Sequence, residues 1–420
     1  MGKPKMNHTF YLIRQAWAGL VLKKGFLTAI VSTLGITLGA LLCILTLAYV
    51  VILKPLPYPD QEQLFKVNTS MVDPVKGNEF SNAISYPSLM YLFENQTVFS
   101  ESALVRYESN VLSSLPTQPT VKNTYVTPGW FELLGSKMAL GRFFDKTEDR
   151  DTFNPVAILS HELWQREFNS ERSVIGKTVT VGSTSFKVVG VLDRDFIEPQ
   201  LAGIGEKTDI FLPWDYNFFN VSPQHRESFG NFSHRHSFVG KLGSEFSLSQ
   251  AEQILSEPIN RHWTEGALDM DSLYDWYIKL ELQPLKNVIL ADSEKTILLL
   301  LAAVLGLLLI ACANITNLFM SRTADQQREL AIQAAIGANK GQLFQTLFVQ
   351  SCLLVFISML VALVIASGGF WILQQYLEQR LPRVDELSMS GVTYVAAFVI
   401  ALLLGAFFAK VSASMINYRA

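Results

Sequence analysis

Three short stretches contain residues of the types that catalyse reactions, but two of them lack a partner that the chemistry requires. His161 and Glu162 begin like the helix of a zinc protease, yet Gln165 stands where the second histidine ligand is needed. Gly205 to Thr208 ends like a phosphate-binding loop, yet a glutamate separates its glycine from its lysine. These stretches therefore predict neither a metalloprotease nor a nucleotide site.

The third stretch contains His234 and His236, which alternate and could hold a metal ion as a surface pair. Alternate positions on a strand rarely serve that purpose without further ligands. The chain also lacks a Gly-x-Ser-x-Gly nucleophile motif, and its three cysteines all fall in long apolar runs. We therefore expect no catalytic residue, no bound metal and no cofactor in this chain, and no enzyme activity of its own.

A charged, alanine-rich segment between two apolar runs has a clearer pattern. Good helix formers fill residues 322–336, and Gly337 is well placed to end the helix. Leu330 and its neighbouring alanines share one side, flanked by Ile332 and Ile336, whereas Arg328 and Glu329 lie towards the other. Small alanines let another surface approach closely, so the segment is typical of a docking helix. The alternative is an interfacial helix that rests on lipid, for which we would expect more lysine and bulky aromatic residues.

Composition shows which elements must carry this helix. Of 420 residues, 49% are hydrophobic and 17% are charged, and the mean hydropathy is +0.24. The apolar excess is concentrated in four runs, each close to or longer than the roughly 20 residues that cross a bilayer as a helix. These runs are Phe26 to Leu53, Thr296 to Met320, Leu343 to Leu373 and Val392 to Ala409. The chain is therefore predicted to be an α-helical membrane protein with four transmembrane helices.

The basic residues predict the orientation. Residues 1–25 carry five lysines and arginines and no acid, which favours a cytoplasmic N-terminus. Residues 54–295 carry 22 basic and 32 acidic residues, which fits an exported domain. Two further crossings place the docking helix and the C-terminus in the cytoplasm. The first run is too long and lacks the cleavage site for a signal peptide, so we interpret it as a permanent anchor.

The large region between the first two apolar runs is predicted to form an α+β extracytoplasmic domain. Residues 178–181 and 185–192 flank a Gly-Ser-Thr turn and predict a hairpin. Ser160 is expected to cap a helix over residues 160–168, and Ser247 or Ser249 is expected to cap another that runs to residue 255. The domain contains no cysteine, so its stability must come from its own core.

In the docking helix and in the large outer domain, the chain resembles the MacB/FtsX-type permeases of ABC transporters. The docking helix and the run before it, ACANITNLFMSRTADQQRELAIQAAIGANKGQL, resemble the second span and coupling helix of that family. The segments KPLPYPDQEQL, YVTPGWFELLGSKMALGRFF and PVAILSHELWQREFNSERSVIGKTVTVGSTSFKVVGVL resemble its MacB-like periplasmic core. The resemblance covers most of the chain, and its segments occur in the same order as in that family.

The resemblance implies a mechanism in which a separate ABC ATPase dimer, carrying ATP and Mg²⁺, moves the coupling helices of two permease subunits. The second permease is identical or homologous to this chain, and the spans pass the movement to the periplasmic domains. A periplasmic adaptor and an outer-membrane duct are expected, with the lipid bilayer but no nucleic acid as further partners. The implied ATPase-coupling residues are Arg328, Glu329, Leu330, Ala331, Ile332, Ala335, Ile336 and Gly337.

The predicted organisation follows from these readings and places the protein in a bacterial inner membrane. Its parts are a cytoplasmic segment 1–25, spans 26–53, 295–320, 343–373 and 391–409, a periplasmic core 54–294, a coupling helix and turn 321–342, a periplasmic loop 374–390 and a tail 410–420. The resemblance implies that, within the core, residues 54–110 and 205–290 form a porter-like part, into which residues 120–200 are inserted as a second subdomain.

Three function classes follow. The leading prediction is the permease of an exporter that expels a peptide or other amphiphile. The alternatives are an FtsX-like regulator of an envelope enzyme and a subunit that releases or senses lipoproteins. A large outer domain favours export over the FtsX-like role.

Overall fold

The computed structural model describes two compact units. It covers residues 8–148, 150–201, 203–218, 222–233, 235–268, 273, 275–290, 293–335, 340–377 and 379–414. The first unit comprises Met1–Lys54 with Asp292–Ala420, and the second comprises Pro55–Ala291.

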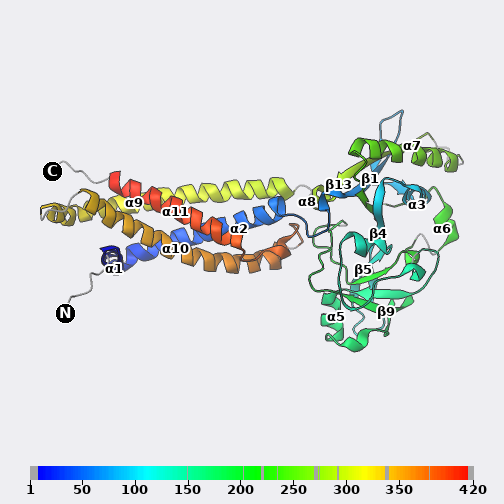
Figure 1. Ribbon diagram of the computed structural model, residues 1–420, viewed down its shortest axis with the longest axis horizontal. Coiled ribbons are helices and arrows are strands. Elements are labelled where there is room, and N and C mark those ends of the chain that lie inside the picture. Colours follow the sequence, from blue (N-terminus) through cyan, green and yellow to red (C-terminus); the bar gives the residue numbers. More distant parts are fainter. Residues whose placement is uncertain are drawn as a thin grey trace. The chain divides into compact units, whose positions relative to one another are not determined.

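The first unit consists of long helices (Figure 1). In the part of the chain that the structure describes, four stretches are long and apolar enough to cross a membrane: Lys24–Leu53, Ser293–Leu318, Phe348–Leu377 and Gly391–Phe408. The prediction of four transmembrane helices is confirmed. The elements are α1 (His8–Val21), α2 (Lys24–Ala48), a π-helical turn η1 (Tyr49–Leu53), α9 (Ser293–Ala335), α10 (Lys340–Leu377), a 3₁₀ turn η6 (Val384–Glu386) and α11 (Gly391–Ser414).

Small residues allow α2 to pack closely on α10. A Cβ atom added at Gly35 would lie 2.8 Å from Cγ1 of Val361, and one added at Gly39 would lie 2.7 Å from Cγ2 of Ile365. The two glycines form a Gly-x-x-x-Gly pattern, which lets membrane helices approach without a side chain between them. The first and third spans are therefore closely packed along this seam.

The second unit is an α+β domain. Its strands are β1 (Leu64–Val72), β2 (Glu79–Ser81), β3 (Ile84–Ser85), β4 (Phe99–Val111), β5 (Thr120–Val126), β6 (Met138–Gly141), β7 (Val156–Leu159), β8 (Thr178–Val181), β9 (Thr184–Leu192), β10 (Ile210–Pro213), β11 (Phe232–Ser233), β12 (His236–Leu242) and β13 (Tyr277–Pro284). Its α-helices are α3 (Tyr86–Asn95), α4 (Gly129–Leu133), α5 (His161–Phe168), α6 (Pro223–Glu227), α7 (Leu248–Gly266) and α8 (Leu285–Leu290). An α+β domain between the first and second spans was predicted, and the prediction is confirmed.

Within the described residues, eleven strands form one sheet in the order β13-β1-β12-β4-β5-β10-β7-β9-β6, with β2 beside β1 and β8 beside β9. Most neighbours are antiparallel, whereas β5–β10 and β7–β9 are parallel. The strands of residues 120–200 thus extend the sheet of the flanking segments. The predicted hairpin is β8–β9, and Ser160 and Ser247 accept backbone hydrogen bonds as the caps of α5 and α7.

Helices α3 and α7 cover one face of the strands β13, β1, β12 and β4 (Figure 1). Apolar residues at helical spacing, among them Leu255, Ile259 and Trp263, bury this side of α7 in the core. The opposite face of the same strands is apolar near α4 and α8, where Val105 and Val239 are buried. Beyond this apolar region, the same face carries polar side chains and contains a cavity.

Candidate coupling site

The predicted docking residues lie on the same helix as the second span. Helix α9 begins with the span Ser293–Leu318 and stays helical for a further seventeen residues, which is about 25 Å at 1.5 Å per residue. Neither glycine nor proline, the usual causes of a kink, occurs between residues 307 and 335. Arg328, Glu329, Leu330, Ala331, Ile332 and Ala335 lie in this helical part, whereas Ile336 and Gly337 lie outside the described residues.

A buried ion cluster joins the end of the first span to the loop between the third and fourth spans. The Arg383 guanidinium donates to both carboxylate oxygens of Glu386, at 2.6 and 3.0 Å, and to the backbone carbonyl of Lys54 at 2.8 Å. Nζ of Lys54 lies 2.7 Å from Glu386. Only 4% of the Arg383 side chain and 5% of the Glu386 side chain are exposed. We call Lys54, Arg383 and Glu386 the loop clamp.

The charges of the loop clamp stabilise each other. Burial alone would raise the pKa of Glu386, but hydrogen bonds and charge from Arg383 and Lys54 outweigh burial and hold that pKa below its ordinary value. The amide of Gln374 on α10 adds a hydrogen bond to the carbonyl of Leu387 at 2.9 Å. The loop is thus fixed to α10 and to Lys54, the residue that follows the first span.

Sequence reasoning did not find the loop clamp. Residues 374–390 were predicted only to form a periplasmic loop, and the partners Lys54 and Arg383 are 329 positions apart. One signal was present. The loop between two apolar runs carries Arg383, Asp385 and Glu386 together, which is a charge cluster that needs partners if it lies at a membrane surface.

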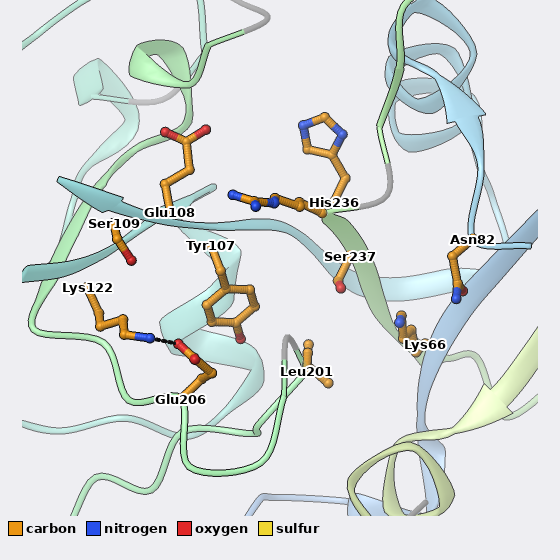
Figure 2. A pocket seen from close by; sticks show the side chains of 11 residues that line it. Lys66, Asn82, Tyr107, Glu108, Ser109, Lys122, Leu201, Glu206, His236 and Ser237 are labelled. Carbon is orange, nitrogen blue, oxygen red and sulfur yellow. Dashed lines mark hydrogen bonds and ion pairs between the residues drawn. The ribbon is translucent and has the colours of Figure 1, made fainter. Parts of the chain in front are cut away.

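The second unit contains a polar cavity of about 430 Å³ on the sheet face opposite α3 and α7. Strand register places Ser109, Lys122 and Ser237 on that face, because Ser109 pairs with Lys122 and Ser237 pairs with Val105. Glu108 and His236 also line the cavity, although they alternate to the other face of their strands. Lys66 of β1 and Tyr107 of β4 contribute further to the lining. Figure 2 shows Lys66 and Ser237 at one end of the cavity and Lys122 at the other, with Tyr107 between them.

The loop that joins β9 to β10 closes one side of the cavity. The hydroxyl of Tyr107 donates to the carbonyl of Pro199 at 3.2 Å, and Lys122 forms an ion pair with Glu206. Glu198 accepts hydrogen bonds from the backbone N–H and the hydroxyl of Thr208, both at 2.9 Å. Burial raises the pKa of Glu198 to about 7, although the Thr208 hydrogen bonds oppose that shift.

The structure also locates the residues of the three catalytic-looking stretches. His161 begins α5 and its ring packs edge-on against Trp164. Glu206 is the cavity residue that pairs with Lys122. Nε2 of His236 lies 3.2 Å from the Arg106 guanidinium, and burial together with that charge lowers the pKa of His236 well below its ordinary value. His234 lies outside the described residues.

Two family models match the chain. The model of the MacB-like periplasmic core domain matches residues 29–257, and that of the FtsX-like permease C-terminal region matches residues 301–419. The first match covers more than half of the chain and includes most of the first span and of the second unit, and the second match covers the later helices of the first unit.

Several curated proteins are similar to the chain. The macrolide export ATP-binding/permease protein MacB of Rhodopseudomonas palustris (strain HaA2) is 22% identical over 294 residues, which cover 69% of this chain and 40% of that protein. The syringafactin export ATP-binding/permease protein SyfD of Pseudomonas syringae pv. syringae (strain B728a), named as probable, is 21% identical over 340 residues, with 79% and 46% covered. The chain spans two fifths to one half of the length of these relatives.

Solved outer domains are also similar. The periplasmic region of MacB from Actinobacillus actinomycetemcomitans is 16% identical, with a TM-score of 0.33, and the match covers 51% of this chain and 87% of that one. The extracellular domain of the ABC-type transporter YknZ from Gram-positive bacteria is 12% identical, with a TM-score of 0.36, and the match covers 52% and 99%.

Proposed function

The chain belongs to the MacB/FtsX-type family of ABC transporter permeases, and we propose that it is the non-catalytic membrane subunit of an exporter driven by a separate ATPase. The single observation that carries this proposal is the unbroken helix α9, which joins the second span to the segment with the predicted docking residues. An ATPase that grips this segment moves the span directly, because no flexible joint lies between them.

The loop clamp supplies a second part of the mechanism. The first span ends at Leu53, the next residue is Lys54, and the periplasmic unit begins at Pro55. Because Arg383 holds the Lys54 backbone, the loop after the third span is tied to the residue that directly precedes that unit in the chain. The close seam between α2 and α10 supports the same coupling along the length of the two spans.

We propose that ATP and Mg²⁺ bind to the partner ATPase dimer, that a second identical or homologous permease subunit completes the complex, and that both termini lie in the cytoplasm of a bacterial cell. A periplasmic adaptor and an outer-membrane duct would receive the cargo, a peptide or another amphiphile. The export names of the similar proteins support this assignment. An FtsX-like regulator is not favoured, because the outer domain matches the MacB-like core.

The proposal is tested by a double substitution, Leu330→Asp with Ile336→Asp, in the full chain reconstituted with its cognate ATPase. We expect the rate of ATP hydrolysis to fall to that of the ATPase alone, because charged side chains replace two apolar ones that the ATPase is proposed to contact. The matched control is Leu248→Asp with Ile254→Asp on the exposed side of α7, where the side chains are 38% and 41% exposed. Unchanged stimulation and export in the first variant would refute the proposed docking site.

A further inference from the structure

The polar cavity contains a lysine whose charge is not balanced. Lys66 is half-buried on β1, and among the described residues its ammonium makes neither an ion pair nor a hydrogen bond. Burial lowers the pKa of Lys66, and no carboxylate among the residues that the structure describes offsets that effect. A lysine in such a position is costly unless a ligand supplies the missing negative charge.

The other charges of the cavity do not supply it. Glu108 accepts a hydrogen bond of 2.6 Å from Arg106, and Glu206 pairs with Lys122. His236 stays neutral because burial and Arg106 lower its pKa. Both acids that line the cavity are thus engaged with other cations, and the cavity is positive within a domain whose composition is acidic.

Uncharged donors lie beside the lysine. The side chains of Ser237 and Asn82 line the same end of the cavity as Lys66 (Figure 2). Neither side chain makes a hydrogen bond to another described residue. An ammonium, a hydroxyl and an amide together provide the donors that a carboxylate or phosphate group accepts.

We propose that this cavity binds a small ligand, or the end of a larger one, through an anionic carboxylate or phosphate group held by Lys66, Ser237 and Asn82. The volume of about 430 Å³ lies in the range of small-molecule sites, roughly 300–1,000 Å³. The Tyr107 ring and Leu201 line the space beyond the anionic group, where they would contact the uncharged body of the ligand.

This inference deepens the proposed function, because it assigns an anionic group to the cargo, but its test needs no ATPase. In the full chain in phosphatidylcholine nanodiscs, the rate of Lys66 acetylation is measured by mass spectrometry. The added probes are inorganic phosphate, N-acetylglycine and N-lauroylglycine, with N-acetylglycinamide as the neutral control. We expect saturable protection of Lys66 by the anions and none by the amide. Tighter protection by N-lauroylglycine than by N-acetylglycine identifies an amphiphile, and equal protection identifies a small soluble anion.

Variants make the test specific. Lys66→Met should weaken anion binding, measured by calorimetry, by tenfold or more, whereas Lys66→Arg should retain it, as expected when one charge-assisted hydrogen bond carries the contact. The matched control is Lys279→Met, because Lys279 lies outside the cavity and pairs with Glu281 at 2.7 Å. The docking variant Leu330→Asp with Ile336→Asp should bind anions normally, so failure of the transport proposal would not affect this result. Equal protection of Lys66 and Lys279, or equal binding by Lys66→Met, would overturn the inference.

Discussion

The loop clamp predicts that two single substitutions will release the loop between the third and fourth spans. Glu386→Gln removes the charge that Arg383 and Lys54 share, and Arg383→Met removes the guanidinium while keeping much of its volume. Because the side chains of Arg383 and Glu386 are only 4% and 5% exposed, either change breaks a buried ion pair by removing one of its two members. Such a loss costs about 3–5 kcal/mol, which corresponds to a change of at least about a hundredfold in a local opening equilibrium.

Hydrogen exchange in the full chain measures this opening directly. Amides of residues 379–390 should exchange at least about a hundredfold faster in either variant than in the native chain, until the unprotected rate is reached. The control is Arg261→Met, which breaks the ion pair of Arg261 and Glu257 at 2.8 Å, where the side chains are 67% and 79% exposed. An exposed pair of this kind contributes at most about 1 kcal/mol.

The pH dependence follows from the lowered pKa of Glu386. A carboxyl whose pKa is depressed by folding stabilises the folded state above its unfolded pKa, and this stabilisation is lost as the pH falls through the folded pKa. The loop should therefore stay protected at neutral pH and open only in acid. If exchange in Glu386→Gln at neutral pH matches that of the control variant, the buried clamp does not hold the loop and the reasoning is wrong.

Two further predictions concern the packing of the spans and the loop beside the cavity. Gly39→Ala places a Cβ 2.7 Å from a third-span isoleucine and should destabilise the fold by about 1–3 kcal/mol, which lowers the unfolding temperature. The control is Gly306→Ala, which should leave the unfolding temperature unchanged because nothing lies within 4 Å of the added Cβ. Equal unfolding temperatures of the two variants would exclude a tight seam between α2 and α10. Folding raises the pKa of Glu198 to about 7, so the folded state favours the protonated carboxyl. The resulting stabilisation is fully present below the ordinary glutamate pKa and is lost as the pH rises through 7. The unfolding temperature should thus fall between pH 5.5 and 8.5 in the native chain and fall less in Glu198→Gln, and identical slopes would contradict the assignment.

Local patterns in the sequence predicted the elements that depend on neighbouring residues. The four apolar runs predicted the spans because hydrocarbon accepts only long helices of apolar residues. Ser160 predicted the start of α5 because a serine hydroxyl satisfies a backbone N–H at a helix end, here that of Leu163. The β8–β9 hairpin was also predicted from neighbouring residues, because the turn-forming Gly182 lies between two apolar segments.

Contacts between distant residues could not be predicted in this way. Asp215, for example, accepts hydrogen bonds from the backbone N–H groups of residues 151, 152 and 153, at 2.8 to 2.9 Å. Nothing in the local sequence of either segment indicates that pairing. The cavity is similar, because Lys66, Tyr107, Lys122 and Ser237 meet only through the order and register of four strands. The register in turn depends on the packing of the whole sheet.

The central claim is that force enters this chain through the cytoplasmic part of α9. A photoreactive amino acid at position 331, introduced into the full chain in cells that express the transporter, tests it most directly. A matched position is 298, where the leucine is 51% exposed within the second span. The account predicts that the ABC ATPase is crosslinked at 331 and not at 298. An ATPase that crosslinks to other cytoplasmic positions and never to 331 would contradict it.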